Sequence, residues 1–366
     1  MQLLVLVQSL STCLCLALVD KVRGVLSRVG ESWVAKACVQ CLACGVTRHV
    51  SIKAINQEMQ MQALSFEGQV AIVTGAGGGL GREHALALAR RGAKVLVNDL
   101  GASVNGAGGS VSAAQAVVDE IVALGGVAMA NGASVTDWDA VQAMVQQAVD
   151  AWGRVDILVN NAGILRDKSF AKMDMDDFRL VVEVHLMGAA NCCKAVWPHM
   201  QVQNYGRIVM TTSSSGLYGN FGQSNYGAAK MAQVGLMQTL AIEGAKYNIH
   251  VNALAPTAAT RMTEGLMTQA VLAALKPEAV VPAMLVLAHS TAPTRTILCA
   301  GAGGFEAAHI TLTQGIYVAQ GDDAPEQLAT QLEAVVDRTG EQVPQSGSAQ
   351  GQLEVGKAMA AQAAVL

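Results

Sequence analysis

Short, continuously apolar runs alternate with stretches of helical periodicity from residue 70 onward. The apolar runs cover residues 70–74, 94–98, 127–130, 157–160, 207–211 and 250–254. Helical patterns fill the intervals; one ends near Arg91, a long one ends near Pro198 and another contains Lys230. Runs that are apolar throughout are typical of parallel strands, because helices cover both faces of such a sheet. Six strand–helix units in series predict an α/β fold of the Rossmann type, a doubly wound parallel sheet in a single domain.

The two ends of the chain differ from this pattern. We predict a leader or disordered extension over 1–60, one domain with the strand–helix pattern over 61–320, and a C-terminal helix (325–338) with a frayed tail over 321–366. Residues 3–19 are apolar but interrupted by polar side chains, so a secretory signal or membrane anchor there is a weaker alternative. The spacing of Cys38, Cys41 and Cys44 is found in iron–sulfur ligation, but the usual fourth cysteine is missing nearby. We therefore predict no metal site.

Glycines follow the first predicted strand, and an acid follows the second. Gly75, Gly79 and Gly81 lie where a strand meets a helix, and glycine lets the backbone approach a ligand closely. The N–H groups of a helix N-terminus attract a pyrophosphate. Asp99 would accept hydrogen bonds from both ribose hydroxyls of an adenosine and would repel a 2′-phosphate, unless it is an ordinary acid at a strand end. The pattern predicts a dinucleotide site and favours NAD over NADP.

A phenol and an amine lie one helical turn apart further along the chain, at Tyr226 and Lys230. An ammonium beside a phenol favours the phenolate, which lowers the phenol's pKa from about 10. Such a group can exchange a proton with an alcohol or a carbonyl oxygen. Ser213, thirteen residues before Tyr226, could bind the same oxygen, with Ser214 and Ser215 as competitors. The spacing alone also fits an exposed helix pair, but beside a dinucleotide site it predicts catalysis.

Composition limits the remaining classes of function. The formal net charge of −4 gives no electrostatic case for binding nucleic acid. The eight cysteines fit no disulfide framework in a chain of this length, so we expect buried thiols in a reducing compartment. No apolar run reaches the roughly 20 residues that span a bilayer, so we expect no membrane partner.

The motifs together resemble a known family. Thr74-Gly75-x-x-x-Gly79-x-Gly81, Asn160-Asn-Ala-Gly163, Ser213 and Tyr226-x-x-x-Lys230 are similar to those of short-chain dehydrogenases/reductases, over about residues 61–300. Segments 98–101, 161–167, 218–223 and 241–244 look like the (3R)-hydroxyacyl-CoA dehydrogenase branch, found as one part of type 2 peroxisomal multifunctional enzymes.

The resemblance implies a role for each matching residue. Tyr226 would be the acid/base, Lys230 would lower its pKa and hold the nicotinamide ribose, and Ser213 would bind the reacting oxygen. The implied contacts to the cofactor NAD are Gly75, Gly79, Leu80, Gly81, Asp99, Ser134, Val135, Asn161, Tyr226, Lys230, Pro256 and Thr257.

Some positions depart from the wider family. His185 stands where many relatives have the asparagine of a proton relay, and either a relay role or no role remains open. Ala133 replaces an acid that many relatives place at the adenine, so we expect one contact to be lost. Residues 257–275, rich in Met and Leu, are expected to cover the substrate as a mobile lid, with a core helix as the alternative.

The resemblance implies oxidation of the 3-hydroxyl of a (3R)-3-hydroxyacyl-CoA to the ketone. Rivals are the same chemistry on a steroid, a 3-oxoacyl carrier-protein thioester or a xenobiotic, and an NAD-binding protein without turnover. A homodimer through helices around 176–200 and 226–246 is expected by resemblance. A peroxisomal location is also expected by resemblance, although the last residues, Ala364-Val-Leu366, are not a Ser-Lys-Leu targeting signal. The alternatives are the cytoplasm and an organelle reached through the N-terminal extension.

Overall fold

The computed structural model describes residues 63–101, 111–259 and 268–363. One eight-stranded sheet has the order β3-β2-β1-β4-β5-β6-β7-β8. Its strands are β1 (Val70–Thr74), β2 (Lys94–Asn98), β3 (Val127–Asn131), β4 (Ile157–Asn160), β5 (Gly206–Thr211), β6 (Ile249–Thr257), β7 (Ile297–Gly301) and β8 (Gly304–Ala308). All neighbours pair in parallel except β7 and β8. The order reverses between β1 and β4, which confirms the predicted doubly wound fold.

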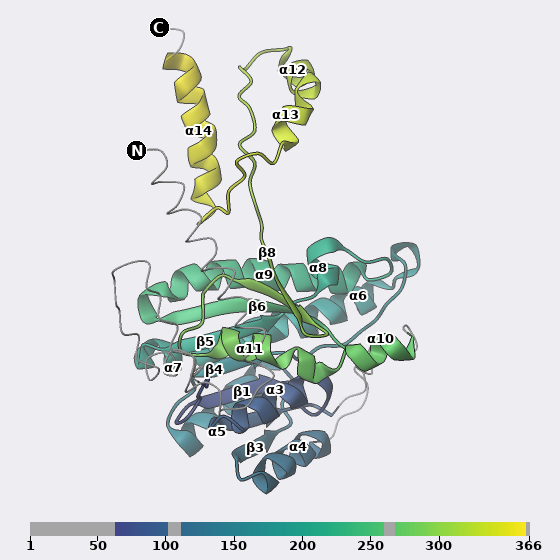
Figure 1. The fold of residues 1–366 in the computed structure, drawn as a ribbon, viewed down its shortest axis with the longest axis vertical. Helices are drawn as coiled ribbons and strands as arrows, with labels where there is room; N and C mark the ends of the chain where they lie inside the picture. Colours follow the sequence, from purple (N-terminus) through teal and green to yellow (C-terminus); the bar gives the residue numbers. More distant parts are fainter. Residues whose placement is uncertain (1–62, 102–110, 260–267, 364–366) are drawn as a thin grey trace, which may run out of the picture. The chain divides into compact units, whose positions relative to one another are not determined.

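Helices cover both faces of this sheet (Figure 1). They are α3 (Gly79–Ala89), α4 (Ser112–Ala123), α5 (Trp138–Trp152), α6 (Met175–Val182), α7 (Gly188–Gln203), α8 (Ser214–Tyr218), α9 (Ser224–Gly244), α10 (Gln269–Ala274) and α11 (Val281–Ala288). Short 3-10 turns occur at Phe170–Lys172, Ala245–Tyr247 and Pro277–Ala279. Side chains of α3, α4 and α11 form one buried core against the sheet, and those of α5, α7 and α9 form a second core. The two cores explain why β1 is buried at every position.

Two predictions about the regular elements were incomplete. Strands β7 and β8 were missed. Strand β7 is a short apolar run that could have been recognised, whereas β8 is a largely exposed, antiparallel edge strand without such a run. The long helix does not end near Pro198 but continues to Gln203. Proline has no N–H, so Pro198 cannot bond to the carbonyl of Lys194, four residues earlier in the helix. The helix continues past this missing bond, at a point where the Lys194 side chain is exposed.

The C-terminal segment was predicted wrongly. The single helix expected over 325–338 is broken at Gln331 into α12 (Ala324–Thr330) and α13 (Leu332–Val336). The tail expected to fray contains a further helix, α14 (Ser348–Ala363). An antiparallel bridge joins Leu312 to Gln342, and Arg295 donates a hydrogen bond to the carbonyl of Pro344 at 3.1 Å.

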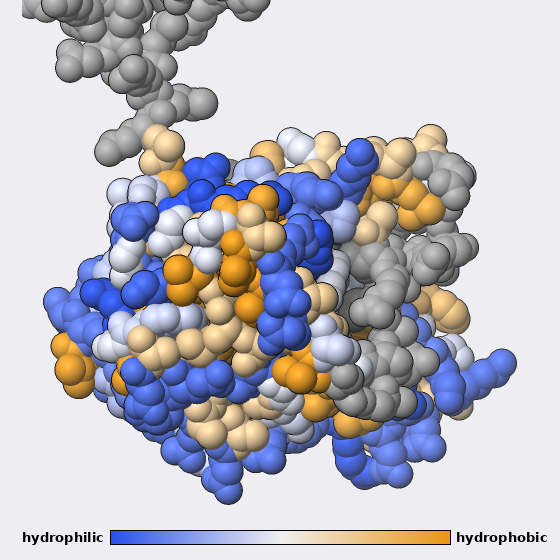
Figure 2. Space-filling view, turned by 90° about the horizontal axis from the view of Figure 1, so that it is seen from below, coloured by the Kyte–Doolittle hydropathy of each residue, from blue (hydrophilic) through white to orange (hydrophobic). Residues whose placement is uncertain are grey.

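The face shown in Figure 2 carries hydrophobic patches between hydrophilic side chains. None of the helices in the described ranges is long and apolar enough to cross a bilayer. The predicted N-terminal extension, the Cys38 cluster and nearly all of the Gly-rich stretch at 101–109 lie outside the described residues. The domain boundaries near 60 and 320 stay predictions.

Candidate active site

A closed turn of glycines joins β1 to α3. Gly75 and Gly79 adopt positive φ angles of 62° and 53°. A Cβ atom at Gly75 would lie 2.7 Å from the Cα of Ala162, and one at Gly81 would lie 2.3 Å from the carbonyl oxygen of Gly75. These clashes are with backbone, so the turn requires glycine at both positions. No side chain caps the first turn of α3, which leaves its N–H groups for an anion, as a bound pyrophosphate requires.

Thr74 and Asn161 hold this turn in place. The Thr74 hydroxyl accepts hydrogen bonds from the N–H groups of Asn161 at 3.0 Å and Ala162 at 3.1 Å. The side-chain amide of Asn161 donates to the carbonyl oxygens of Thr74 and Gly75, both at 3.0 Å. Sequence reasoning gave Thr74 no role, although a hydroxyl at the last position of a buried strand was a usable signal. Asn161 was expected along the cofactor, and the structure adds that it builds the cofactor turn.

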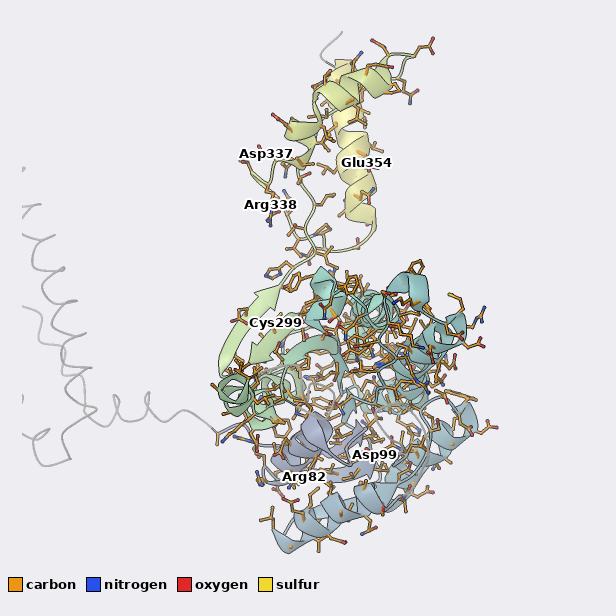
Figure 3. The ribbon with its side chains drawn as sticks, turned by 90° about the vertical axis from the view of Figure 1, so that its right-hand side faces the viewer. Arg82, Asp99, Cys299, Asp337, Arg338 and Glu354 are labelled. Atoms are coloured by element: carbon orange, nitrogen blue, oxygen red, sulfur yellow. The ribbon has the colours of Figure 1, made fainter. Side chains whose placement is uncertain are left out.

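Asp99, which is labelled in Figure 3, follows β2, and its carboxylate contacts the glycine turn. Its carboxylate accepts the N–H groups of Gly77 and Gly101, each at 2.7 Å. A carboxylate oxygen can accept two hydrogen bonds, so each oxygen keeps capacity for a ribose hydroxyl. The free helix terminus, the glycine cradle and this carboxylate fit a dinucleotide with an unmodified adenosine ribose.

The other expected cofactor residues follow strands at the same edge of the sheet. Ser134 and Val135 come shortly after β3; the Ser134 hydroxyl lies 2.8 Å from that of Thr136, and Val135 is buried. Pro256 and Thr257 end β6. In a doubly wound sheet this carboxyl edge holds the ligand crevice. Much of the predicted lid, residues 260–267, lies outside the described residues, and α10 forms its end.

The structure brings together Ser213, Tyr226 and Lys230. Ser213 begins α8, and its side chain hydrogen-bonds the phenol of Tyr226. The Lys230 ammonium lies 5.5 Å from the centre of the Tyr226 ring and donates to the carbonyl of Thr211. Of the competing serines, Ser214 is exposed, and Ser215 donates its hydroxyl to Gln223 at 2.7 Å. Ser213 alone of these three makes the bond to the phenol.

Burial dominates the electrostatics of this trio. Burial raises the pKa of Tyr226, the hydrogen bond from Ser213 opposes that rise, and the charge of Asp167 adds to it. Burial also lowers the pKa of Lys230 to about 7. Burial thus outweighs the other influences on the phenol, and the lowering of its pKa by Lys230 stays a prediction. With a pKa of about 7, about half of the Lys230 side chains are neutral at pH 7, so on average the amine stabilises the phenolate with only part of a positive charge.

His185 lies in a π-helical turn, Glu183–Met187, between α6 and α7. Its Nε2 atom is 2.8 Å from the carbonyl oxygen of Ile164, and its ring meets that of Tyr226 edge-on with 5.2 Å between centroids. A Cβ at Gly163 would lie 2.2 Å from the His185 ring. Burial, and then the charge of Lys230, lower the pKa of His185 well below its usual value. The contacts give this histidine a packing role against Tyr226, and a relay role stays a prediction.

We expect Gly81→Ala to weaken both folding and dinucleotide binding. The new methyl group would meet the carbonyl oxygen of Gly75 at 2.3 Å, and overpacking of this kind costs about 1–3 kcal/mol. The melting temperature and a titration with NADH followed by fluorescence would measure both losses. Gly235→Ala on α9 is the matched control, because nothing lies within 4 Å of its added methyl. Equal behaviour of the two variants would contradict the role given to the turn.

Known proteins match this chain in sequence and in fold. The family described as "short chain dehydrogenase" matches residues 69–270. Peroxisomal multifunctional enzyme A of Dictyostelium discoideum is 52% identical over 257 residues, which cover 70% of this chain and 58% of that protein. The structure of full-length peroxisomal multifunctional enzyme type 2 from Drosophila melanogaster matches with a TM-score of 0.65 and 39% identity, over 79% of this chain and 49% of that one.

A third match is a 7α-hydroxysteroid dehydrogenase solved with NADH and 7-oxo glycochenodeoxycholic acid. It has a TM-score of 0.59 and 32% identity, over 66% of this chain and 95% of that one. The chain spans less than two thirds of the length of the multifunctional relatives. The predicted resemblance to the family and to its multifunctional branch is confirmed. The chain belongs to the short-chain dehydrogenase family and is an oxidoreductase that acts on CH–OH groups.

Proposed function

We propose that this protein oxidises the 3-hydroxyl group of a (3R)-3-hydroxyacyl-CoA to the 3-ketone with NAD. The observation that supports this most directly is the assembly of Ser213, Tyr226 and Lys230 next to β5, at the same sheet edge as the glycine turn and Asp99. The resemblance of segments 98–101, 161–167, 218–223 and 241–244 to the (3R)-hydroxyacyl-CoA dehydrogenase branch supports the thioester as the substrate class.

The residues of this chain have separate tasks in that reaction. Ser213 donates a hydrogen bond to the substrate oxygen, and Tyr226 as the phenolate removes the hydroxyl proton. Lys230 holds the nicotinamide ribose and, when protonated, favours the phenolate. The glycine turn, Asp99 and Lys230 would hold NAD, which would supply the hydride acceptor for the reaction. Because the phenol must lose its proton, we expect oxidation to become faster as the pH rises.

A direct test compares steady-state rates of the full chain on matched alcohols. We expect kcat/KM to be highest for a (3R)-3-hydroxyacyl-CoA of some chain length, with the (3S) epimer turned over slowly. A steroid is the second candidate, because one structural match was solved with a bile-acid ketone. A preference of tenfold or more for steroid over every thioester would overturn our choice and leave the hydride chemistry in place.

Asp99→Ser should reduce the preference for NAD over NADP. The carboxylate that accepts from Gly77 and Gly101 would repel a 2′-phosphate and bind ribose hydroxyls, and serine does neither as strongly. Losing one charged hydrogen-bonding group is worth about 1.5–3 kcal/mol, so the ratio of kcat/KM values should shift by about 10–100-fold. Asp150→Ser, on the exposed face of α5, is the control. An unchanged ratio would contradict the assignment of Asp99 to the ribose.

The location and assembly of the protein follow from the same proposal. We infer a peroxisomal setting from the names of the relatives, and a homodimer through the α7 and α9 region. Sedimentation of the purified chain would measure the assembly. A monomer at working concentrations would reject the dimer without touching the chemistry.

A further inference from the structure

We propose that Gln223 is a positioning residue, which fixes the Ser213 hydroxyl by bridging α8 to the loop that contains Asp167. The inference deepens the proposed function, because it concerns the serine and phenol of that same site. It assigns a role to a side chain that lies three residues before Tyr226 and for which the resemblance to the family implied no role.

The Gln223 amide makes three hydrogen bonds to other side chains. Its oxygen accepts from the Ser215 hydroxyl at 2.7 Å and from the Asn220 amide at 3.1 Å. Its nitrogen donates to the Asp167 carboxylate at 2.6 Å. Gln223 precedes α9 as its N-terminal cap residue, but its side chain makes no capping bond. The side chain therefore joins its near neighbours Ser215 and Asn220 to Asp167, which lies 56 residues earlier in the sequence.

The bridge continues to the reacting groups. The backbone N–H of Ser215 donates to the Ser213 hydroxyl oxygen at 3.2 Å, and that hydroxyl bonds to the phenol of Tyr226. Hydrogen bonds therefore join Asp167 to Gln223 and Gln223 to the hydroxyl of Ser215, and the backbone N–H of the same Ser215 bonds to Ser213. With its oxygen held by the Ser215 N–H, the Ser213 hydroxyl has a defined direction in which to donate its hydrogen.

One backbone hydrogen bond and one from a side-chain amide also hold the two loops together beside this bridge. The N–H of Lys168 donates to the carbonyl of Gly222 at 2.9 Å, and the Asn225 amide donates to the carbonyl of Arg166 at 3.0 Å. These contacts do not involve the Gln223 side chain, so a substitution there can loosen α8 without separating the loops. The helix α8 has only five residues and few hydrogen bonds of its own, which makes its position dependent on such outside contacts.

The test reverses the polarity of one hydrogen bond in the bridge. Gln223→Glu sets a second carboxylate against Asp167 at a distance where like charges repel, and the donor is lost. Asp167→Asn with Gln223→Glu restores a donor and an acceptor across the same gap, and the introduced carboxylate can still accept from Ser215. The control is Gln146→Glu on α5, where a glutamine donates to Asp150 at the same 2.6 Å on the surface.

We expect Gln223→Glu to lower kcat about tenfold, because a displaced catalytic group commonly costs that much or more. Its NADH dissociation constant should stay within about twofold, since the bridge does not touch the glycine turn. The double variant should regain most of kcat, and Gln146→Glu should match the wild type. Hydrogen exchange of the α8 amides should become faster in Gln223→Glu and recover in the double variant.

Each outcome separates the two proposals. If the wild type turns over no alcohol, the proposed function fails, and the exchange of α8 amides still tests the bridge. If the wild type is active and Gln223→Glu keeps both its kcat and its α8 exchange, the bridge is wrong. A loss of kcat that the double variant does not recover would also reject it, because charge pairing across this gap would then not be the cause.

Discussion

Tyr226→Phe is expected to lower kcat by about 10²–10⁴-fold, the range that a positioned proton-transfer group supplies, while NADH still binds. The phenol is the group that exchanges a proton with the substrate oxygen, and Ser213, which bonds to it, has no comparable ability to ionise. The ring that packs edge-on against His185 is kept, so the site should stay folded. Single-turnover rates and an NADH titration measure the two effects separately.

The control for this variant is Tyr247→Phe, which removes a hydroxyl from a partly exposed ring after α9. It should change neither the single-turnover rate nor the binding of NADH. Wild-type turnover by the Tyr226→Phe protein would contradict the proposed mechanism. Loss of NADH binding in this variant would show that the phenol is needed to build the cofactor site. A wild type that binds NADH but oxidises none of the tested alcohols would favour the non-catalytic alternative instead.

The central strands and the cofactor turn could be predicted from the sequence because each has a local cause. The buried run 70–74, the glycines after it and Asp99 after the second strand depend on backbone sterics and short-range chemistry. The strand β8 could not be predicted in this way. It is exposed and antiparallel, and its pairing with β7 is set by a tight turn at positive φ angles in Ala302 and Gly303.

The electrostatics of the site could not be predicted from spacing either. One helical turn between Tyr226 and Lys230 brings the two side chains near each other, but burial sets the sign of both pKa shifts. Burial depends on the whole fold, and no four-residue pattern reports it. The same holds for the bond from Gln223 to Asp167, which exists because two loops 56 residues apart in the sequence meet in the fold. The chemistry of single residues was predictable, and their surroundings were not.

Lys230→Met should lose activity by about 100-fold or more and yet make the fold more stable below pH 7. Burial holds the pKa of Lys230 near 7 against an ordinary value of 10.5, so the folded state binds fewer protons than the unfolded state between these values. Stability of the wild type therefore rises with pH across that window, and the cost of the buried charge is full below about pH 7. Methionine removes this cost.

The expected gain for Lys230→Met is about 1–4 kcal/mol in the free energy of unfolding, reduced by about 1 kcal/mol for the lost bond to Thr211. Urea unfolding at pH 6 and pH 9.5 measures it, and the gain should shrink at the higher pH because wild-type Lys230 is then neutral when folded. Lys194→Met, at an exposed position on α7, is the control and should show no such dependence. A variant that is less stable than the wild type at pH 6 would mean that Lys230 is fully charged and well compensated in the fold. Its ammonium would then be a stronger partner for the phenolate than burial alone indicates.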